Sequence, residues 1–277
     1  MSNLISETIL PNGLKIFVIS KEEALVLYEQ VNEYFKNEIV LHPGDTVFDV
    51  GANIGLFSLS VYESCNKNVN IFAFEPIPAI FNVLQANAQR FNLEKIKVFP
   101  CGISDESKIT QFDYYPNATA LSNAFPEDAK QLQNQLKSAI INNIYEAPPR
   151  IRRLRWLPKF MRSIILHQEG KKAFQVERVT CKMRTLSDIL QEYNIQKVDL
   201  LKIDVEKSEL DVFLGIKEQD WQKIKQVVVE VHDVDGRVDQ MAKILKNNGF
   251  SKVILEQEPV FKGSNIFSLY ALRQKSE

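Results

Sequence analysis

The stretch of sequence that decides the fold is Val47-Phe-Asp-Val-Gly-Ala-Asn-Ile-Gly55. It has the pattern of a buried strand with an acidic residue, followed by a glycine-bounded turn into a helix. The chain holds only ten glycines in 277 residues, so this pair indicates a place where a ligand approaches the backbone closely. The pattern is neither GxGxxG nor a P-loop, because no Gly-Lys-Ser or Gly-Lys-Thr follows. A dinucleotide or a nucleoside triphosphate is therefore disfavoured.

Downstream of this stretch, short apolar runs alternate with segments of helical periodicity, which predicts an α/β fold with helices on both faces of a sheet. Amphipathic helices are predicted at 79–92 and from Val238 to just before Gly249. Only the last two predicted strands lack a helix between them. A dehydrogenase-type Rossmann sheet begins the same way, but this closing antiparallel hairpin favours the seven-stranded, mostly parallel sheet of a class I methyltransferase. The predicted strands cover residues 47–50, 70–74, 96–99, 198–203, 226–231, 252–255 and 266–272.

Two regions lie outside this alternation. Residues 1–45 are predicted to form an N-terminal helical lid element, whose amphipathic helix at 22–40 would lie across the sheet or over its ligand. Residues 46–277 would form the methyltransferase domain. Within it, residues 116–176 break the pattern with prolines and are predicted to be an inserted lid or acceptor-binding region with a helix at 127–145.

The insertion carries a strongly basic stretch at residues 150–172, where eight Lys and Arg residues stand against a single acid, Glu169. Apolar residues are interleaved with these cations. Three interpretations stay open: the solvated face of an exposed helix, a surface that lies on an anionic membrane, and a docking surface for an acidic carrier domain.

The composition of the whole chain excludes several classes of partner. With 34 Lys and Arg against 35 Asp and Glu, no overall basic field draws the chain to nucleic acid. Its three cysteines are Cys65, Cys101 and Cys181, an odd number without a CxxC pair, which argues against a disulfide framework or a zinc knuckle and fits a cytoplasmic location. The sequence shows no signal peptide and no run of about 18 apolar residues, so neither export nor a membrane span is expected.

The residues around the glycine turn suit a ligand with an amino acid head and one adenosine. Asp49 can accept hydrogen bonds from an ammonium group, while the glycine-rich backbone leaves room for a methionyl chain. The next predicted strand ends in Ala73-Phe-Glu-Pro76, which places Glu75 20 residues after Gly55. A carboxylate at the tip of the second strand can accept hydrogen bonds from both hydroxyls of a ribose.

Three segments taken together, VFDVGANIGLFS, AFEP and LLKIDVEKSELDVFLGI, resemble the FkbM-type methyltransferases, which depend on S-adenosyl-L-methionine. The resemblance runs from about residue 10 to residue 273, and the segments PNGLKI and YYPNATALS are similar to the subgroup associated with polyketide and nonribosomal peptide assembly lines. It implies a class I methyltransferase fold with S-adenosyl-L-methionine as methyl donor. It also implies Glu75 at the ribose, Asp49, Gly51, Asn53 and Gly55 at the methionyl end, and Cys101 and Gly102 beside the adenine.

Two further strand ends gather polar side chains at the same edge of the sheet. The fourth predicted strand ends in KIDVE and the fifth in EVHD. Residues two apart on a strand share a face, so Asp204 and Glu206 can point together into the crevice where open α/β sheets bind ligands. The same holds for Glu230 and His232. Glu206 can equally begin and cap a helix, which would separate it from Asp204.

The chemistry of this second group points to an alcohol acceptor. An imidazole titrates near neutrality, so His232 is predicted to be the general base and Glu230 the carboxylate that fixes its tautomer; a structural histidine is the competing interpretation. The proton of an alcohol must leave as the new bond forms, which favours oxygen over carbon. As an alternative, a hard divalent ion that polarises a diol could be held by the cluster of Asp204, Glu206, Glu230, His232 and Asp233. Nothing in their spacing demands a metal, so a metal is not favoured.

The sequence therefore predicts an O-methyltransferase that acts on a hydroxyl of a polyketide or nonribosomal peptide intermediate, with tethering of that intermediate to an acyl or peptidyl carrier protein as a further hypothesis. Two other functions stay open. One is a sugar O-methyltransferase of the same fold, and the other is a non-catalytic adenosine-binding or scaffold protein. The intact set of Asp49, Gly51, Gly55 and Glu75 argues against the scaffold, which would not need it.

Overall fold

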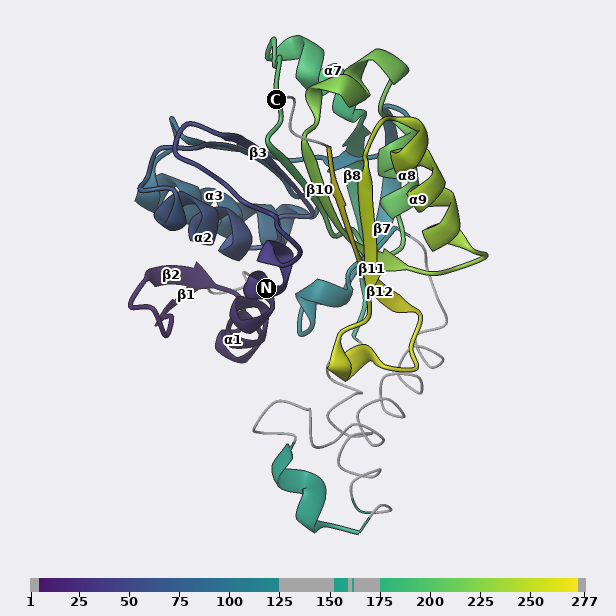
Figure 1. The fold of residues 1–277 in the computed structure, drawn as a ribbon. Coiled ribbons are helices and arrows are strands. Elements are labelled where there is room, and N and C mark those ends of the chain that lie inside the picture. The colour runs from purple at the N-terminus through teal and green to yellow at the C-terminus, as the bar shows by residue number, and fades with distance from the viewer. Residues whose placement is uncertain (1–4, 125–151, 159–160, 162–174, 274–277) are drawn as a thin grey trace.

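The computed structural model describes residues 5–124, 152–158, 161 and 175–273. Its centre is a seven-stranded sheet of β3 (Thr46–Val50), β4 (Asn70–Phe74), β5 (Ile96–Phe99), β9 (Leu200–Ile203), β10 (Gln226–His232), β11 (Lys252–Glu256) and β12 (Ile266–Leu272). The strand order is β11-β12-β10-β9-β3-β4-β5 (Figure 1). All neighbouring strands are parallel except β12, which runs antiparallel to β10 and β11. The predicted sheet and its closing hairpin are confirmed.

Helices cover both faces of the sheet, because successive strand residues point to opposite sides. They are α2 (Leu56–Ser64), α3 (Pro78–Phe91), α7 (Leu186–Glu192), α8 (Glu209–Leu214) and α9 (Arg237–Asn247). Val47 belongs to the apolar cluster under α2 and α3, whereas its neighbour Phe48 belongs to the cluster under α7, α8 and α9. Figure 1 shows α2 and α3 on one side of the sheet and α8 and α9 on the other. Among these and the other described helices, none has both the length and the apolar character needed to cross a bilayer.

The N-terminal segment contains more than the predicted helix. It consists of a hairpin of β1 (Ser6–Ile9) and β2 (Lys15–Val18), then α1 (Lys21–Gln30) and a 3-10 turn, η1 (Val31–Phe35). Asn87 of α3 ties down the hairpin, since its side chain accepts from the N–H of Phe17 at 2.8 Å and donates to the carbonyl oxygen of Phe17 at 3.0 Å. The helical segment stops short of residue 40 because Asn37 and Glu38 have positive φ. Within α1, the apolar side chain of Leu25 is 42% exposed.

A second, three-stranded sheet that the sequence pattern did not predict flanks the insertion. Its strands are β6 (Gly102–Ile103), β7 (Lys108–Tyr114) and β8 (Glu177–Arg184). β8 pairs in parallel with β6 and antiparallel with β7, so the chain leaves this sheet after β7 and returns to it at β8. Further 3-10 turns are η2 (Thr119–Leu121), η3 (Arg153–Trp156), η4 (Glu218–Lys223) and η5 (Pro259–Phe261).

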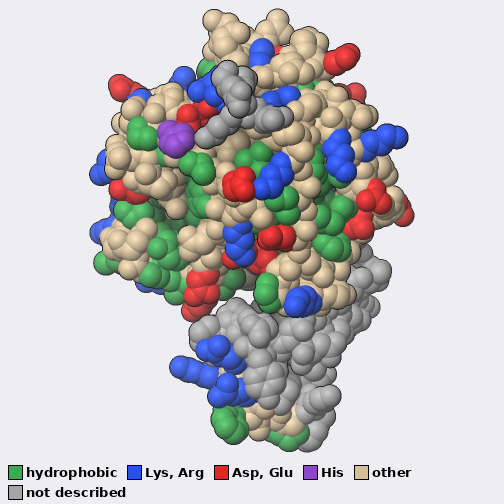
Figure 2. Space-filling model, in the orientation of Figure 1, with side chains coloured by type: hydrophobic (Ala, Val, Ile, Leu, Met, Phe, Trp, Pro, Cys, Tyr) green, Lys and Arg blue, Asp and Glu red, His purple; other side chains and the backbone are tan. Residues whose placement is uncertain are grey.

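The described part of the insertion includes η3 and its neighbours. The predicted helix at 127–145 and most of the basic stretch at 150–172 lie outside the described residues. Arg153 and Arg155 of η3 are exposed, and Trp156 is 80% exposed. Lys and Arg side chains gather on the lower lobe in Figure 2, where η3 lies. This turn therefore presents a cationic and aromatic surface to solvent.

Candidate functional site

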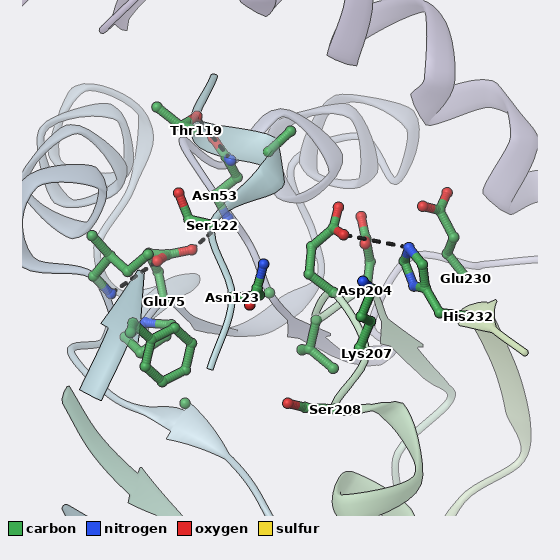
Figure 3. Close-up of a pocket in the computed structure, with 18 of the residues that line it drawn as sticks. Asn53, Glu75, Thr119, Ser122, Asn123, Asp204, Lys207, Ser208, Glu230 and His232 are labelled. Atoms are coloured by element: carbon green, nitrogen blue, oxygen red, sulfur yellow. Dashed lines mark hydrogen bonds and ion pairs between the residues drawn. The ribbon is translucent and has the colours of Figure 1, made fainter. Parts of the chain in front are cut away.

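A pocket of about 400 Å³ opens where β3, β4, β9 and β10 end. Two groups of polar residues line it from opposite sides, as Figure 3 shows. Asn53 and Glu75 lie on one side, which we call the Glu75 end. Asp204, Glu230 and His232 lie on the other, which we call the His232 end. The two groups of residues singled out in the sequence thus face a single cavity.

The Glu75 end is built on the glycine turn after β3. Gly51 has a φ of 77°, and a Cβ at this position would lie 1.8 Å from the carbonyl oxygen of Asp204, so no other residue fits there. Asn53 lines the pocket and donates from Nδ2 to Thr119 Oγ1 at 3.2 Å. Gly55, with a φ of 91°, occupies the N-cap position of α2 and is not among the residues that line the pocket. Its part is to turn the chain.

Glu75 is the buried carboxylate of this end, with 5% of its surface exposed. Its oxygens accept hydrogen bonds from the backbone N–H groups of Asn53 at 3.1 Å and Ile77 at 2.9 Å. Burial raises the pKa of Glu75 to about 7, although these two hydrogen bonds act in the opposite direction. Each carboxylate oxygen can accept a second hydrogen bond. Glu75 can therefore still accept from two hydroxyl groups that enter the pocket.

Asp49 lies beneath the turn and not in the pocket. Ser58 Oγ donates to its Oδ2 at 2.7 Å, and Lys202 Nζ lies 3.1 Å from its Oδ1. Lys202 also donates to the carbonyl oxygen of Gly51 at 2.9 Å. The expected contact between Asp49 and a cofactor ammonium is corrected here, because the carboxylate is fully buried and already paired with a cation. The pair instead holds the glycine turn in place.

The two residues expected beside the adenine face different cavities. Gly102 lines the main pocket, and a Cβ on it would lie 2.6 Å from Met183 Cε. Cys101 lines a second pocket with Phe99 and Arg184, and burial raises the pKa of its thiol to about 11. Of this pair, only Gly102 lines the main pocket, and the expectation that both residues flank an adenine stays a prediction.

The His232 end brings two carboxylates and an imidazole together. Glu206 comes from the turn after β9, and Glu230 and His232 are two residues apart on β10. His232 Nε2 lies 3.4 Å from Glu206 Oε2. One oxygen of each glutamate and one ring nitrogen of His232 all lie within 4.8 Å of one another. We call these three residues the acid–imidazole cluster. His232 is its most buried member, with 5% of its surface exposed.

Glu206 neither extends the strand nor caps a helix. β9 ends at Ile203, and α8 begins at Glu209 after Ser208 in the N-cap position. Glu206 and Lys207 have φ values of 48° and 79°. Two consecutive non-glycine residues in this left-handed region store strain of roughly 1–3 kcal/mol each, a feature that is common at functional sites.

Glu209, which the sequence interpretation missed, orients the imidazole. Its Oε1 lies 3.0 Å from His232 Nδ1 and accepts from the N–H of Lys207 at 2.7 Å, while its Oε2 accepts from Arg237 Nη1 at 3.3 Å. The carboxylate that orients His232 is thus Glu209 and not Glu230, because the ring turns toward the first residue of α8. The signal in the sequence is an acidic residue directly before the apolar run of a helix.

Carboxylates dominate the electrostatics of this end. Burial alone would lower the pKa of His232, but Glu206 and Glu209 outweigh it and raise the pKa to about 9. Burial raises the pKa of Glu206 to about 7. Burial, and then the neighbouring carboxylate of Asp204, raise the pKa of Glu230 well above its usual value. These carboxylates therefore favour a positive charge at the His232 end.

Asp204 connects this end to the N-terminal segment. Tyr34 of η1 donates its hydroxyl hydrogen to Asp204 Oδ2 at 2.9 Å, and Lys202 Nζ lies 3.8 Å from the same oxygen. Leu27 and Gln30 of α1 also line the pocket. Part of the N-terminal segment therefore forms a wall of the site, which no sequence motif indicated for Tyr34.

Known proteins resemble this chain in sequence and in fold. Residues 49–252 match the family described as "Methyltransferase FkbM domain". The chain is 37% identical, over 99% of both lengths, to the 31-O-demethyl-FK506 methyltransferase FkbM of Streptomyces tacrolimicus. It is 31% identical to the AMB antimetabolite synthetase AmbE of Pseudomonas aeruginosa over 96% of its own length, but it spans 12% of that protein. The crystal structure of Methyltransferase FkbM from Methylobacillus flagellatus has the same fold, with a TM-score of 0.52 at 15% identity over 89% of this chain and 51% of that one.

Proposed function

Because the chain belongs to the FkbM methyltransferase family and is a methyltransferase that uses S-adenosyl-L-methionine, we propose that it methylates a hydroxyl oxygen of a natural-product intermediate. One observation carries the proposal: a single cavity runs from the Glu75 end to the acid–imidazole cluster. The first suits an adenosine and its methionyl chain. The second suits an alcohol that must lose a proton.

The residues of the Glu75 end fit the cofactor. Glu75 keeps acceptor capacity for two ribose hydroxyls, and Gly51 and Gly102 line the pocket with backbone alone, because a Cβ on either would collide with Asp204 or Met183. The bound cofactor supplies a methyl group on a positively charged sulphur. The protein itself holds the sugar, keeps the glycine turn fixed through Lys202, and keeps water out of the pocket.

The bonds that break and form in methyl transfer define what the His232 end must do. The bond between sulphur and the methyl carbon breaks, and its electron pair stays on sulphur. A bond forms between that carbon and the acceptor oxygen, while the hydroxyl proton leaves for a carboxylate of the cluster or for His232 in its neutral form. We assign this step to His232, Glu206 and Glu230, with Asp204 beside them at the same end. Glu209 acts through His232 as a positioning residue.

The class of acceptor is argued from the relatives. One is named for 31-O-demethyl-FK506 and another as an antimetabolite synthetase, which supports a natural-product hydroxyl over a sugar hydroxyl. A scaffold without activity is disfavoured, because the pocket holds both ends of a transfer site.

A carrier protein is the proposed partner, and the cytoplasm the proposed location. The match to a short part of a synthetase supports an acceptor tethered to an acyl or peptidyl carrier. The exposed arginines and Trp156 of η3 support docking of an acidic partner. The three cysteines are free and buried, which supports a reducing compartment.

Product analysis tests the proposal. The purified protein is incubated with methyl-deuterated S-adenosyl-L-methionine and either a hydroxylated polyketide or its deoxy analogue as the matched control. The label should appear on oxygen, located by mass spectrometry and NMR, and only in the hydroxylated compound. Label on carbon or nitrogen would contradict the assignment to oxygen. Tight cofactor binding without transfer to any hydroxyl would favour a scaffold.

A further inference from the structure

We propose that Glu206, Glu230 and His232 bind a divalent metal cation of the hardness of Mn²⁺. Their donor atoms lie within 4.8 Å of one another, and the Glu206 Oε2 to His232 Nε2 distance is 3.4 Å. Ligands about 2.0–2.2 Å from one ion lie roughly 3–4 Å apart, so modest movements of side chains complete the site. The role of the ion rests on the proposed function, whereas its binding does not.

The position of Glu209 supports this site independently, because Glu209 is not one of the three ligands. Its Oε1 lies 3.0 Å from Nδ1 of His232, and the N–H of Lys207 and the guanidinium of Arg237 hold its carboxylate in place. Nδ1 is therefore placed to donate its hydrogen to Glu209, and Nε2, which faces Glu206, can offer a lone pair to an ion once it has released its proton. Histidines that bind metals almost always donate their other N–H to a carboxylate or carbonyl in this manner.

The balance of charge at the His232 end also favours a cation. Glu230 lines the pocket, and within residues 5–124 and 175–273 its carboxylate makes no hydrogen bond or ion pair. The nearby cations are engaged elsewhere, because Lys202 pairs with Asp49 and Arg237 bonds to Glu209. Among the described residues, no Lys or Arg forms an ion pair with Glu206 or Glu230, so a divalent ion would supply positive charge that these two carboxylates otherwise share with the imidazole alone.

The donor set indicates the kind of ion and its use. Two carboxylate oxygens and one imidazole nitrogen suit Mn²⁺ or Zn²⁺ better than Ca²⁺, which prefers oxygen alone, or copper(I), which prefers sulphur. Three protein ligands leave positions open, as in catalytic metal sites. An acceptor hydroxyl that contacts the ion loses its proton more readily, which is the task assigned to this end of the pocket.

The test measures metal binding directly. Protein freed of metal with EDTA, and without a polyhistidine tag, is titrated with Mn²⁺ while the free ion is followed by electron paramagnetic resonance. We expect one site per chain in the wild type. Glu230→Gln and His232→Ala should each weaken binding by at least about tenfold. Glu209→Gln should weaken it by about 10–100-fold, because Glu209 orients His232 without contacting the ion. Glu218→Gln and His42→Ala, at exposed positions, are the matched controls and should bind Mn²⁺ like the wild type.

The outcomes separate this inference from the proposed function. Absence of a stoichiometric site in the wild type, or equal affinity in Glu230→Gln and His232→Ala, overturns the inference. If methyl transfer to oxygen also proceeds at full rate in EDTA, the proposed function stands without the metal. If Mn²⁺ binds as expected and no hydroxyl is methylated, the metal site stands and the proposed function fails.

Discussion

The two ends of the pocket are constructed differently. The polar groups of the Glu75 end are backbone groups, the side chain of Asn53 and one carboxylate, drawn mainly from the consecutive turns after β3 and β4. The His232 end consists of titratable side chains from separate segments, namely Tyr34, Asp204, Glu206, Glu209, Glu230, His232 and Arg237. A binding surface for a fixed cofactor can be local and nearly uncharged. A site that must move a proton needs opposed charges, which only distant segments brought together can provide.

The largest expected effect comes from removing the imidazole, which should change turnover without changing cofactor affinity. His232→Ala should lower turnover by about 100-fold or more, because proton transfer by a positioned group is typically worth 10²–10⁴-fold. Affinity for S-adenosylhomocysteine should stay unchanged, since Glu75 and the glycine turn lie at the other side of the pocket. Steady-state kinetics and calorimetry measure the two quantities, with His42→Ala as control. Near-full turnover of the variant would remove His232 from the reaction.

Glu75→Ala tests the opposite end. Loss of a charge-assisted acceptor for two hydroxyls should weaken the binding of S-adenosylhomocysteine by roughly 1.5–3 kcal/mol. Calorimetry measures this change, circular dichroism checks the fold, and Glu218→Ala is the matched control at an exposed position. Unchanged affinity in a folded variant would place the ribose elsewhere.

The pH dependence of cofactor binding sharpens the contrast. The pKa of Glu75 is about 7 in the protein alone, and hydroxyl donors favour its ionised form. Binding should therefore release a proton below pH 7, and affinity should rise about tenfold from pH 6 to the plateau near pH 8. Calorimetry across this range measures the slope for S-adenosylhomocysteine. Glu75→Gln should flatten it, and an identical slope in that variant would assign the titration to another group.

The smallest expected effect lies outside both ends, on η3. Reversing Arg152, Arg153 and Arg155 to Glu should raise the KM for a carrier-bound acceptor severalfold and flatten its dependence on salt, because the opposite charges no longer attract. Cofactor affinity should not change. Kinetics at low and high salt measure both effects. Equal activity of the triple variant at low salt would exclude docking on this surface, and sedimentation of the wild type with anionic vesicles would favour a membrane instead.

Local patterns in the sequence were sufficient to predict the central sheet and the position of Glu75 at its carboxyl edge. Apolar runs, helical periodicity and a glycine turn depend on residues close together in the chain, so they are readable without the fold. The three-stranded sheet was not readable, because it pairs Gly102 with Met183 across the whole insertion. The helix expected at 22–40 was too long because the positive φ of Asn37 and Glu38 has no simple periodic signal.

What the sequence by itself determined was which residue types gather at the carboxyl edge of the sheet, because strand ends and two-residue spacing fix that edge. Only the tertiary structure decided what each side chain meets. Asp49 stands opposite Lys202 in the register of β3 and β9, so it pairs with that lysine beneath the turn. Glu209 reaches His232 because α8 packs against β10, and Glu230 is left facing the pocket. Strand alternation chooses a face, but the partner on that face is set by the neighbouring strands and helices that pack there.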